Sequence, residues 1–354
     1  MIHPQWREFL QSLGARPGTD PGAAVEDFGD AAAERQAAVD GDVLCDLSPL
    51  ALLAIAGADA VAFLQGQLTN DVQRVDASHS QLTAHCNPKG RMLFLGRLLR
   101  HAEEGLLLCL PQPLLDTALK RLRLYVLRAK VALADRSVEL ARLGVAGPQA
   151  LARLAQRLGP LPEAADACRH YDGLSVVRLP GPRPRVMLIG PVVQCRSLWQ
   201  ELAALARPAG YHAWRLLDIL AGLPSLHPTT VEAFVPQMVN LQLLNGVSFR
   251  KGCYTGQEIV ARTEYLGKLK RRMYLARVAS DEPPAPGSPL YSPQADPGQE
   301  TGRVVDAVSH PAGGSVLLAV CLIACAEGGE VRLGGAAGPR LAFQPLPYPL
   351  PTGN

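Results

Sequence analysis

The sequence predicts an α+β fold that ends in an all-β region. From residue 43 to residue 266, short apolar runs typical of strands alternate with segments in which apolar residues recur three and four positions apart, as in helices. Beyond Lys268 the helical pattern stops, and short strand-like runs are separated by Pro-rich and Gly-rich turns, as in a small barrel. The length of 354 residues favours two or three structural units.

Composition narrows the class of protein. A hydrophobic fraction of 48% with 19% charged residues describes a globular chain. No run of eighteen apolar residues occurs, and the first thirteen residues lack the pattern of a secretory signal. The eight cysteines are scattered, which fits a reducing compartment, and a net charge of +3 does not by itself indicate nucleic-acid binding. We therefore expect a cytoplasmic protein that does not span a membrane.

The first half of the chain divides into two predicted regions. Residues 1–29 form an amphipathic helix at 3–13, ended by Gly14, and a Gly/Pro-rich linker. Residues 30–136, together with 211–266, form a first α+β subdomain, which carries the loop described below. Its expected elements are helices at 58–68, 114–127 and 214–220, strands at 81–85, 92–99 and 130–134, and a turn at 87–90.

Two further regions complete the predicted organisation. Residues 137–210 form a second α+β subdomain, with strands at 138–145, 174–179 and 186–189 and helices at 148–158 and 197–206. Residues 267–354 form the C-terminal β-barrel, with strands at 273–278, 302–308, 315–320 and 331–333. Cys321 and Cys325 lie in the apolar run of this region, where core packing is favoured over metal binding.

The loop around Cys253 concentrates chemically active residue types. It reads Phe-Arg-Lys-Gly-Cys-Tyr-Thr-Gly-Gln-Glu over residues 249–258 and leads into a predicted helix for which Thr255 is the expected N-cap. Gly252 and Gly256 permit a close approach of the backbone to a ligand. A thiol just before a helix start and beside Lys251 is favoured to ionise, because positive charge and free amide groups stabilise a thiolate. Cys253 is therefore the candidate reactive group.

Two plainer interpretations compete with these assignments. A lone cysteine is more often a small buried hydrophobe than a nucleophile, but the neighbours of Cys253 are polar or glycine and do not alternate as in a buried strand. Eight basic residues between 250 and 277 stand against only two acidic ones. They are either a solvated edge-strand surface or a site for a polyglutamylated folate tail, an RNA backbone or an acidic partner.

Taken together, these residues resemble the YgfZ family of folate-binding proteins, relatives of the glycine-cleavage aminomethyltransferases. The family signature Lys-Gly-Cys-Tyr-x-Gly-Gln-Glu is matched at every fixed position by residues 251–258. Further similar segments lie at 57–59, 64–72, 87–91, 221–224, 234–237, 240–241 and 345–348. Residues 261–272 are also similar to the mitochondrial branch associated with late 4Fe–4S cluster assembly.

The resemblance implies an aminomethyltransferase-like ring of three lobes, two α+β subdomains and a C-terminal β-barrel, around a folate-sized cavity. It implies tetrahydrofolate or a one-carbon derivative as cofactor, and a role in supporting iron–sulfur assembly or repair and iron–sulfur-dependent tRNA modification. Cys253 and Lys251 correspond to the cysteine and the lysine of the family motif. The residues expected to bind the cofactor are Trp214, Gln237, Asn240 and Arg262. The implied partners are iron–sulfur assembly proteins or their client enzymes, and tRNA through Lys268–Arg272.

Two positions depart from the patterns of these relatives. Leu50 replaces a second tryptophan found in some of them, and Leu220 replaces an acidic residue just before Ala-Gly. A lost carboxylate would remove a charge-assisted hydrogen bond to the pterin worth about 1.5–3 kcal/mol. Trp214 itself either stacks on the pterin or packs in a helix core.

Two other functions compete with the folate-dependent accessory role. A true aminomethyltransferase carries an aspartate after its hairpin, where this chain has Phe94 and Leu95, so it lacks the carboxylate for that reaction. A non-enzymatic scaffold would use the basic strip Lys268–Arg272 to dock RNA or an iron–sulfur carrier. Whether Cys253 supports a one-carbon transfer is left open by the sequence.

Overall fold

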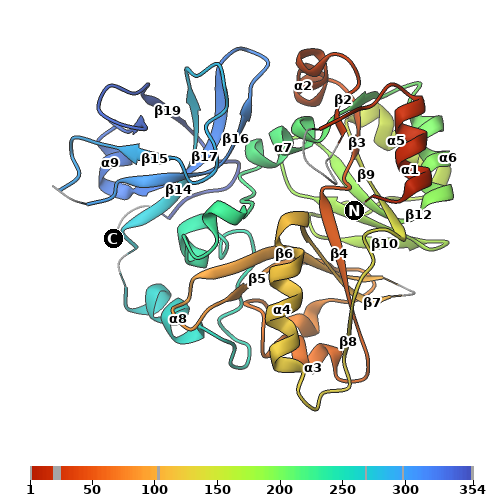
Figure 1. Ribbon diagram of the computed structural model, residues 1–354, viewed down its shortest axis with the longest axis horizontal. Helices are drawn as coiled ribbons and strands as arrows, with labels where there is room; N and C mark the ends of the chain where they lie inside the picture. The colour runs from red at the N-terminus through yellow and green to blue at the C-terminus, as the bar shows by residue number, and fades with distance from the viewer. Residues whose placement is uncertain (1, 19–24, 102–103, 268, 297–298, 352–354) are drawn as a thin grey trace. The chain divides into compact units, whose positions relative to one another are not determined.

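A computed structural model describes the whole chain except residues 1, 19–24, 102–103, 268, 297–298 and 352–354 (Figure 1). The chain divides into two compact units. Unit 1 comprises Met1–Gln65, Val72–Gln81 and Gly96–Leu217, and unit 2 comprises Gly66–Asp71, Leu82–Leu95 and Asp218–Asn354. No helix in the described ranges is long and apolar enough to span a membrane. The four-part division expected from the sequence stays a prediction.

Unit 1 contains a six-stranded sheet in the order β10-β11-β12-β9-β3-β13. All neighbouring strands are antiparallel except β13 and β3, which are parallel. The strands are β3 (Val43–Asp46), β9 (Leu140–Ala146), β10 (Cys168–Tyr171), β11 (Leu174–Leu179), β12 (Arg185–Pro191) and β13 (Arg207–Ala209). The helices of this unit include α1 (Pro4–Ser12), α2 (Ala31–Asp40), α5 (Pro148–Leu158) and α6 (Val192–Leu202). The small sheet β1 (Arg16–Pro17) and β2 (Val25–Asp27) lies in the segment expected as a linker.

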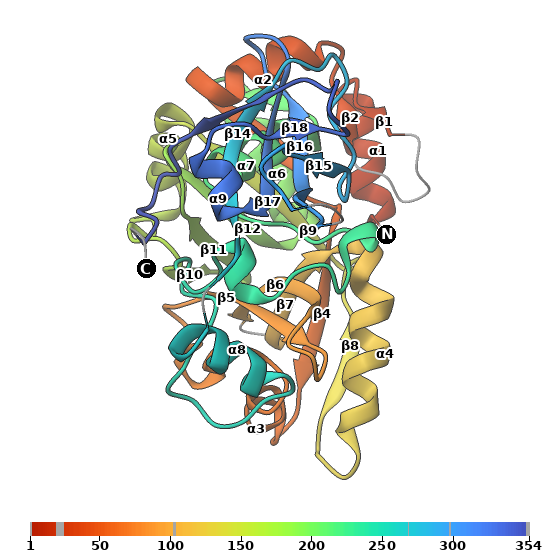
Figure 2. The ribbon, with the colours of Figure 1, turned by 90° about the vertical axis from the view of Figure 1, so that its left-hand side faces the viewer.

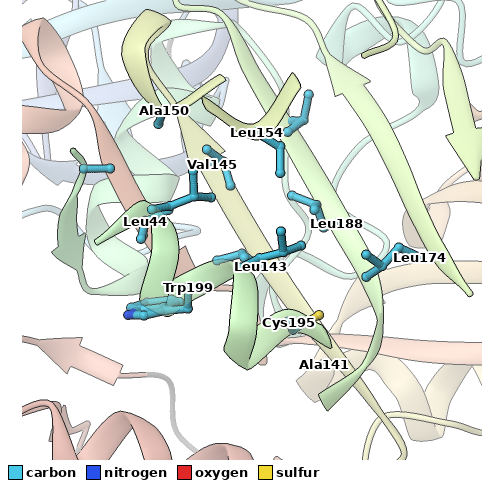
Figure 3. Close-up of a cluster of buried hydrophobic side chains, with 14 of the residues drawn as sticks. Leu44, Ala141, Leu143, Val145, Ala150, Leu154, Leu174, Leu188, Cys195 and Trp199 are labelled. Atoms are coloured by element: carbon cyan, nitrogen blue, oxygen red, sulfur yellow. The ribbon is translucent and has the colours of Figure 1, made fainter. Parts of the chain in front are cut away.

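One apolar cluster joins the helices of unit 1 to its sheet. Figure 3 shows Leu143 and Val145 of β9 and Leu188 of β12 with Cys195 and Trp199 of α6. Trp6 of α1 meets Trp199 edge to face, with ring centroids 5.7 Å apart. Trp6 Nε1 also donates a hydrogen bond of 2.8 Å to Asp46 Oδ1. The N-terminal helix is therefore part of the core, because burying two indole rings is strongly favourable.

A second, five-stranded sheet has the order β5-β6-β7-β4-β8. The chain passes from one unit to the other within β6. Its strands are β4 (Leu50–Ala56), β5 (Gln81–Cys86), β6 (Met92–His101), β7 (Gly105–Pro111) and β8 (Ala132–Asp135). The helical segments near it in sequence are α3 (Ala60–Gln65), η1 (Val72–Arg74), η2 (Gln112–Leu114) and α4 (Leu115–Val126). Helix α7 (Tyr211–Leu220) follows β13.

The C-terminal part of unit 2 is a curled sheet in the order β18-β15-β16-β17-β14-β19 (Figure 2). An isolated bridge joins Arg332 of β18 to Arg340, the residue before β19. The strands are β14 (Arg271–Val278), β15 (Pro289–Tyr291), β16 (Gly302–Ser309), β17 (Ser315–Leu322), β18 (Arg332–Leu333) and β19 (Leu341–Gln344), with α9 (Ile323–Glu327) after β17. Cys321 and Cys325 are buried in this core, as expected. The short helices η3 (Pro228–Thr230) and η4 (Pro236–Val239) and helix α8 (Gln257–Tyr265) precede it.

The predicted α+β class with an all-β end is confirmed, and several elements match closely. Helix α5 and strand β11 have the predicted bounds. Helix α6 was expected at 197–206 but runs from Val192 to Leu202, because Pro191 ends β12 and Val192 and Cys195 already pack inward. Strands β15 and β19 were not predicted, since both are short and next to Pro-rich segments.

Candidate functional site

Cys253 lies in an exposed loop at the start of α8. We call residues 249–257 the Cys253 loop. Cys253 is exposed, whereas the other seven cysteines are buried. Burial raises the pKa of four of those thiols to about 12, namely Cys86, Cys168, Cys195 and Cys321. The thiolate is the nucleophilic form of cysteine, and burial disfavours it. We therefore expect a reagent in solution to react first with Cys253.

Lys251 anchors the Cys253 loop to a neighbouring turn of unit 2. Its Nζ donates hydrogen bonds to the backbone carbonyls of Leu68 at 2.6 Å and Asn70 at 3.0 Å. Nζ also lies 5.1 Å from the centroid of the Tyr254 ring. Burial lowers the pKa of Lys251 to about 8, and the charge of Asp71 opposes that shift. The lysine of the motif therefore positions the loop, in addition to any part in chemistry.

The turn that receives Lys251 is itself held by buried polar side chains. Thr69 Oγ1 donates to the carbonyl of Gly246 at 2.8 Å. Asn70 Nδ2 donates to the carbonyls of Leu82 at 3.0 Å and Asn245 at 2.5 Å. Sequence comparison singled out this Thr-Asn segment as a motif but assigned it no role. The segment holds the backbone carbonyls to which Lys251 donates, so it supports the Cys253 loop through Lys251.

The Cys253 loop is packed on the hairpin turn formed by residues 87–91, beside which Figure 1 draws α8. Gly256 has φ +83°, and a Cβ there would lie 2.4 Å from the carbonyl oxygen of Asn87. A Cβ on Gly90 would lie 3.0 Å from Cβ of Ile259. Gly256, not Thr255, is the N-cap of α8, so the predicted cap was wrong by one residue. Glycine is needed here because the left-handed backbone and the close approach both exclude a side chain.

The hairpin turn adopts the predicted geometry. Asn87 Oδ1 accepts hydrogen bonds from the amides of Lys89 at 2.9 Å and Arg91 at 3.0 Å, which closes the turn through a side chain. Asn87 Nδ2 donates to Glu232 Oε1 at 2.8 Å. The asparagine of the motif therefore determines the turn against which Gly256 packs.

The positions expected to hold an aspartate in an aminomethyltransferase are apolar and buried here. Phe94 is fully buried, and its ring stacks on His85 with centroids 5.1 Å apart. Leu95 is 3% exposed. The described residues contain no group of three or more His, Cys, Asp or Glu side chains arranged to hold a metal ion.

Comparisons with known proteins show which family this chain is similar to. The tRNA-modifying protein YgfZ of Yersinia pseudotuberculosis serotype O:1b (strain IP 31758) is 36% identical over 307 residues, which cover 87% of this chain and 92% of the relative. The protein of the same name from Yersinia enterocolitica serotype O:8 (strain NCTC 13174 / 8081) shows the same identity and coverage. This chain belongs to the YgfZ family.

Two broader similarities agree with membership of the YgfZ family. The GCVT N-terminal domain matches residues 18–180. The crystal structure of the glycine cleavage system aminomethyltransferase T from Bartonella henselae has a TM-score of 0.76 and 20% identity, and covers 96% of each chain. The predicted aminomethyltransferase-like fold is therefore confirmed. A sequence identity of 20% supports similarity of fold alone.

Gln237 and Asn240 of this YgfZ-family chain are buried in unit 2. Gln237 Nε2 donates to the carbonyl of Val260 in α8 at 2.6 Å. Asn240, with φ +59°, donates from Nδ2 to the carbonyl of Met273 in β14 at 3.0 Å. Both side chains thus tie η4 to neighbouring elements. Gln237 Oε1 and Asn240 Oδ1 are buried acceptors for which no hydrogen-bond donor is found among the described residues.

Trp214 and Arg262 occupy contrasting environments. Trp214 belongs to unit 1 and is 1% exposed, with its ring against Gly144 and the guanidinium carbon of Arg185 5.1 Å from its centroid. It is a core side chain, the second of the two roles considered from the sequence. Arg262 is exposed on the last turn of α8. Roles for both in folate binding stay predictions.

Part of the strip Lys268–Arg272, which is predicted to contact tRNA, forms hydrogen bonds within the fold. Lys268 lies outside the described residues. Arg271 Nη2 donates to the carbonyl of Glu300, and Arg272 Nη1 donates to the carbonyl of Pro351 at 3.1 Å. The exposed basic side chains of the region, for which the described residues show no hydrogen bond or ion pair, are Arg250, Arg262 and Lys270. Those three residues are better candidates for contacting an anionic partner.

Proposed function

We propose that this protein is a tetrahydrofolate-binding accessory protein that supports iron–sulfur-dependent tRNA modification, with Cys253 as its reactive group. The observation that carries the proposal is the exposure of Cys253 on a loop whose other motif residues hold it in place. Relatives at 36% identity are named tRNA-modifying proteins, which supports the tRNA part of the proposal. The link to iron–sulfur assembly or repair rests on the family resemblance.

Folate fits the donor and acceptor chemistry of unit 2. The pterin ring presents N–H and amino donors, and Gln237 Oε1 and Asn240 Oδ1 are buried acceptors that lack a donor. A buried polar atom without a partner costs about 1–3 kcal/mol, so a ligand that supplies the donor gains that energy. We propose Gln237 and Asn240 as the residues that orient the ring, and Arg262 as a partner for the glutamate carboxylates. When bound, the cofactor would supply a carrier for a one-carbon unit.

The chain's own contribution is the placement of a nucleophile. Lys251 fixes the loop through two backbone carbonyls, and the backbone contact between Gly256 and the hairpin turn fixes its other end. The thiol between them stays accessible without requiring the loop to rearrange. A covalent role for Cys253 follows from this placement, because a sulfur nucleophile is effective when it is accessible and held near its reaction partner.

The test is complementation of a bacterial strain that lacks its own member of this family. We expect Cys253→Ala to lose rescue, scored by the activity of a 4Fe–4S enzyme and by the level of thiomethylated tRNA. The control is the circular dichroism spectrum and thermal unfolding of Cys253→Ala, which should match those of wild type because Cys253 is exposed. Equal rescue by wild type and Cys253→Ala would remove the thiol from the mechanism.

A docking scaffold is the second candidate, and the exposure of Arg250, Arg262 and Lys270 favours it. Charge reversal at Arg250 and Lys270 tests it and avoids Arg262, the proposed folate partner, as well as Arg271 and Arg272, whose side chains bond to backbone carbonyls of the fold. Loss of rescue by the charge-reversal variant, with full rescue by Cys253→Ala and unchanged tetrahydrofolate affinity, would favour docking. The reverse pattern supports thiol chemistry.

A further inference from the structure

Unit 2 contains a cavity of about 330 Å³ beside the hairpin turn, which contributes Arg91 to its lining. We call it the arginine pocket, because Arg91, Arg271 and Arg303 all line it. Arg91 comes from the hairpin turn, Arg271 from the start of β14 and Arg303 from β16. Three arginines from separate elements therefore line one cavity.

Two of these arginines are held by the backbone. Arg91 Nη1 donates to the carbonyls of Ala233 at 2.6 Å and Glu232 at 3.3 Å. Arg271 Nη2 donates to the carbonyl of Glu300. Neither forms an ion pair with a carboxylate among the residues that the structure describes. Both charges are thus positioned by neutral oxygens and remain uncompensated, which is the condition in which a guanidinium attracts an anion.

One of the two acidic residues of the pocket bonds to a residue outside the lining, and the other pairs with a pocket arginine. Glu232 accepts a hydrogen bond from Asn87 through Oε1, and its backbone has φ +62°, a strained value for a residue with a side chain. Glu300 pairs with Arg303 at the rim, where both side chains are nearly half exposed. With three arginines against two glutamates, the pocket carries a net charge of about +1 before any ligand binds.

Most of the remaining lining residues are apolar, and Thr229 adds a hydroxyl group. Phe234 and Val320 are buried, and Met238 is partly buried. Small-molecule sites combine apolar walls with a few convergent polar groups, and their volumes start near 300 Å³. The arginine pocket lies at the small end of that range. Its size suits a compact group with an anionic end, and it is too small for a folded macromolecule to enter as a whole.

From these contacts we infer that the arginine pocket binds a phosphate group carried on a compact organic body, of the size of a single nucleotide. Phosphate is favoured over a single carboxylate, because it offers oxygens to more than one guanidinium at once. The phosphate comes either from a free nucleotide or from one nucleotide of an RNA strand. The lining includes neither Cys253 nor the residues proposed to bind folate, although Met238 of the lining lies on η4 with Gln237.

Isothermal titration of the full chain at low ionic strength tests the inference. The probes are inorganic phosphate, adenosine monophosphate, a short single-stranded oligoribonucleotide and, as a carboxylate comparison, diglutamate. We expect adenosine monophosphate or the oligoribonucleotide to bind, and Arg91→Gln and Arg303→Gln each to weaken that binding about tenfold or more. The matched control is Arg277→Gln, since Arg277 also lies in β14 and bonds to a backbone carbonyl, that of Gly313, but does not line the pocket.

The outcomes separate the sources of the phosphate. Binding of adenosine monophosphate assigns a free nucleotide, and binding of the oligoribonucleotide alone assigns an RNA strand. Failure of every phosphate probe to bind, tighter binding of diglutamate, or an equal loss in Arg277→Gln would overturn the inference. If Arg91→Gln fails to fold because the hairpin turn is lost, Arg303→Gln at the exposed rim decides the question. Cys253→Ala should bind the same probes as wild type, so the proposed function can fail independently.

Discussion

Gly256 and Gly90 approach each other through their backbones: a Cβ on Gly256 would lie 3.0 Å from the Cα of Gly90. The Cys253 loop and the hairpin turn are therefore packed without any side chain between them. This contact explains why the loop has a glycine directly before α8, and it links two sequence motifs that are more than 160 residues apart.

We expect Gly256→Ala to lower the free energy of unfolding by at least about 1–2 kcal/mol, because alanine is strained in the left-handed region. The new methyl group would also lie 2.4 Å from the carbonyl oxygen of Asn87. Urea denaturation followed by circular dichroism measures the change. Gly252→Ala, with open space around its Cβ, should stay within about 0.5 kcal/mol of wild type. Equal stability of the two variants would show that the contact does not exist in solution.

The eight thiols should differ sharply in reactivity. Because Cys253 is exposed and the other seven are buried, we expect brief treatment of the native protein with iodoacetamide to modify Cys253 alone. Peptide mass spectrometry identifies the modified residue. Cys253→Ser should abolish the rapid modification, and denatured protein should take up label at all eight positions. Rapid labelling of Cys86 or Cys168 in the native chain would contradict the burial of those thiols.

Much of the fold was predictable because its signals are local. Helix α5 begins with Pro148 after Gly147 and ends at Gly159, so the sequence marks both ends. The turn at Asn87 was predictable for the same reason, since the asparagine side chain closes it within five residues. Helix α6 was misplaced because its true start has no polar cap and follows directly on a strand.

The candidate site was only partly predictable. The residue types around Cys253 indicated an accessible thiol, which the structure shows. The role of Lys251 could not be derived, because its partners are the carbonyls of Leu68 and Asn70, more than 180 residues away. The arginine pocket was missed for a similar reason. Its three arginines are separated by long stretches of chain, and no local pattern relates them.

Lys251 should give the protein's stability a distinct pH dependence. Its pKa is lowered to about 8 by burial, below the ordinary value of 10.5, so between these values the unfolded chain binds a proton that the folded chain does not. The cost of burying the charge is fully present below pH 8 and disappears as the pH rises towards 10.5. We therefore expect the stability of wild type relative to Lys251→Met to increase between pH 8 and pH 10.

Denaturation curves recorded in that pH range check the sign of this effect. Lys251→Arg is the informative control, because its guanidinium stays charged and should show no such increase relative to Lys251→Met. A relative stability that falls with rising pH would mean that the ammonium is stabilised in the fold, not penalised. In that case the hydrogen bonds from Lys251 to the carbonyls of Leu68 and Asn70 would stabilise the ammonium by more than burial destabilises it.

The Gly-Ala-Asp motif at residues 57–59 should stabilise the fold through its contacts with the turn that follows α4. Asp59 Oδ2 accepts a hydrogen bond of 2.7 Å from the amide of Lys130, and a Cβ on Gly57 would lie 2.1 Å from the carbonyl oxygen of Lys130. We expect Asp59→Ala to lower the free energy of unfolding by about 0.5–2 kcal/mol, as for the loss of a capping side chain. Gly57→Ala should cost more, since it adds backbone strain at φ +118°. Thermal unfolding of both variants decides the order, and a Gly57→Ala variant as stable as wild type would contradict the close contact.

Substitution of Trp214 distinguishes a role in core packing from a role in ligand contact. Its ring fills the space above Gly144, where a Cβ would lie 2.5 Å from a ring carbon, and it is 1% exposed. We expect Trp214→Leu to lower the free energy of unfolding by about 2–4 kcal/mol, because the smaller side chain leaves a cavity and removes the contact with Arg185. Trp199→Leu is the matched control, since Trp199 is equally buried but lies in the other core cluster of unit 1. If both variants are destabilised and titrate tetrahydrofolate alike, Trp214 acts through packing alone, because a ring that touched the pterin would add a loss of affinity that Trp199→Leu does not share.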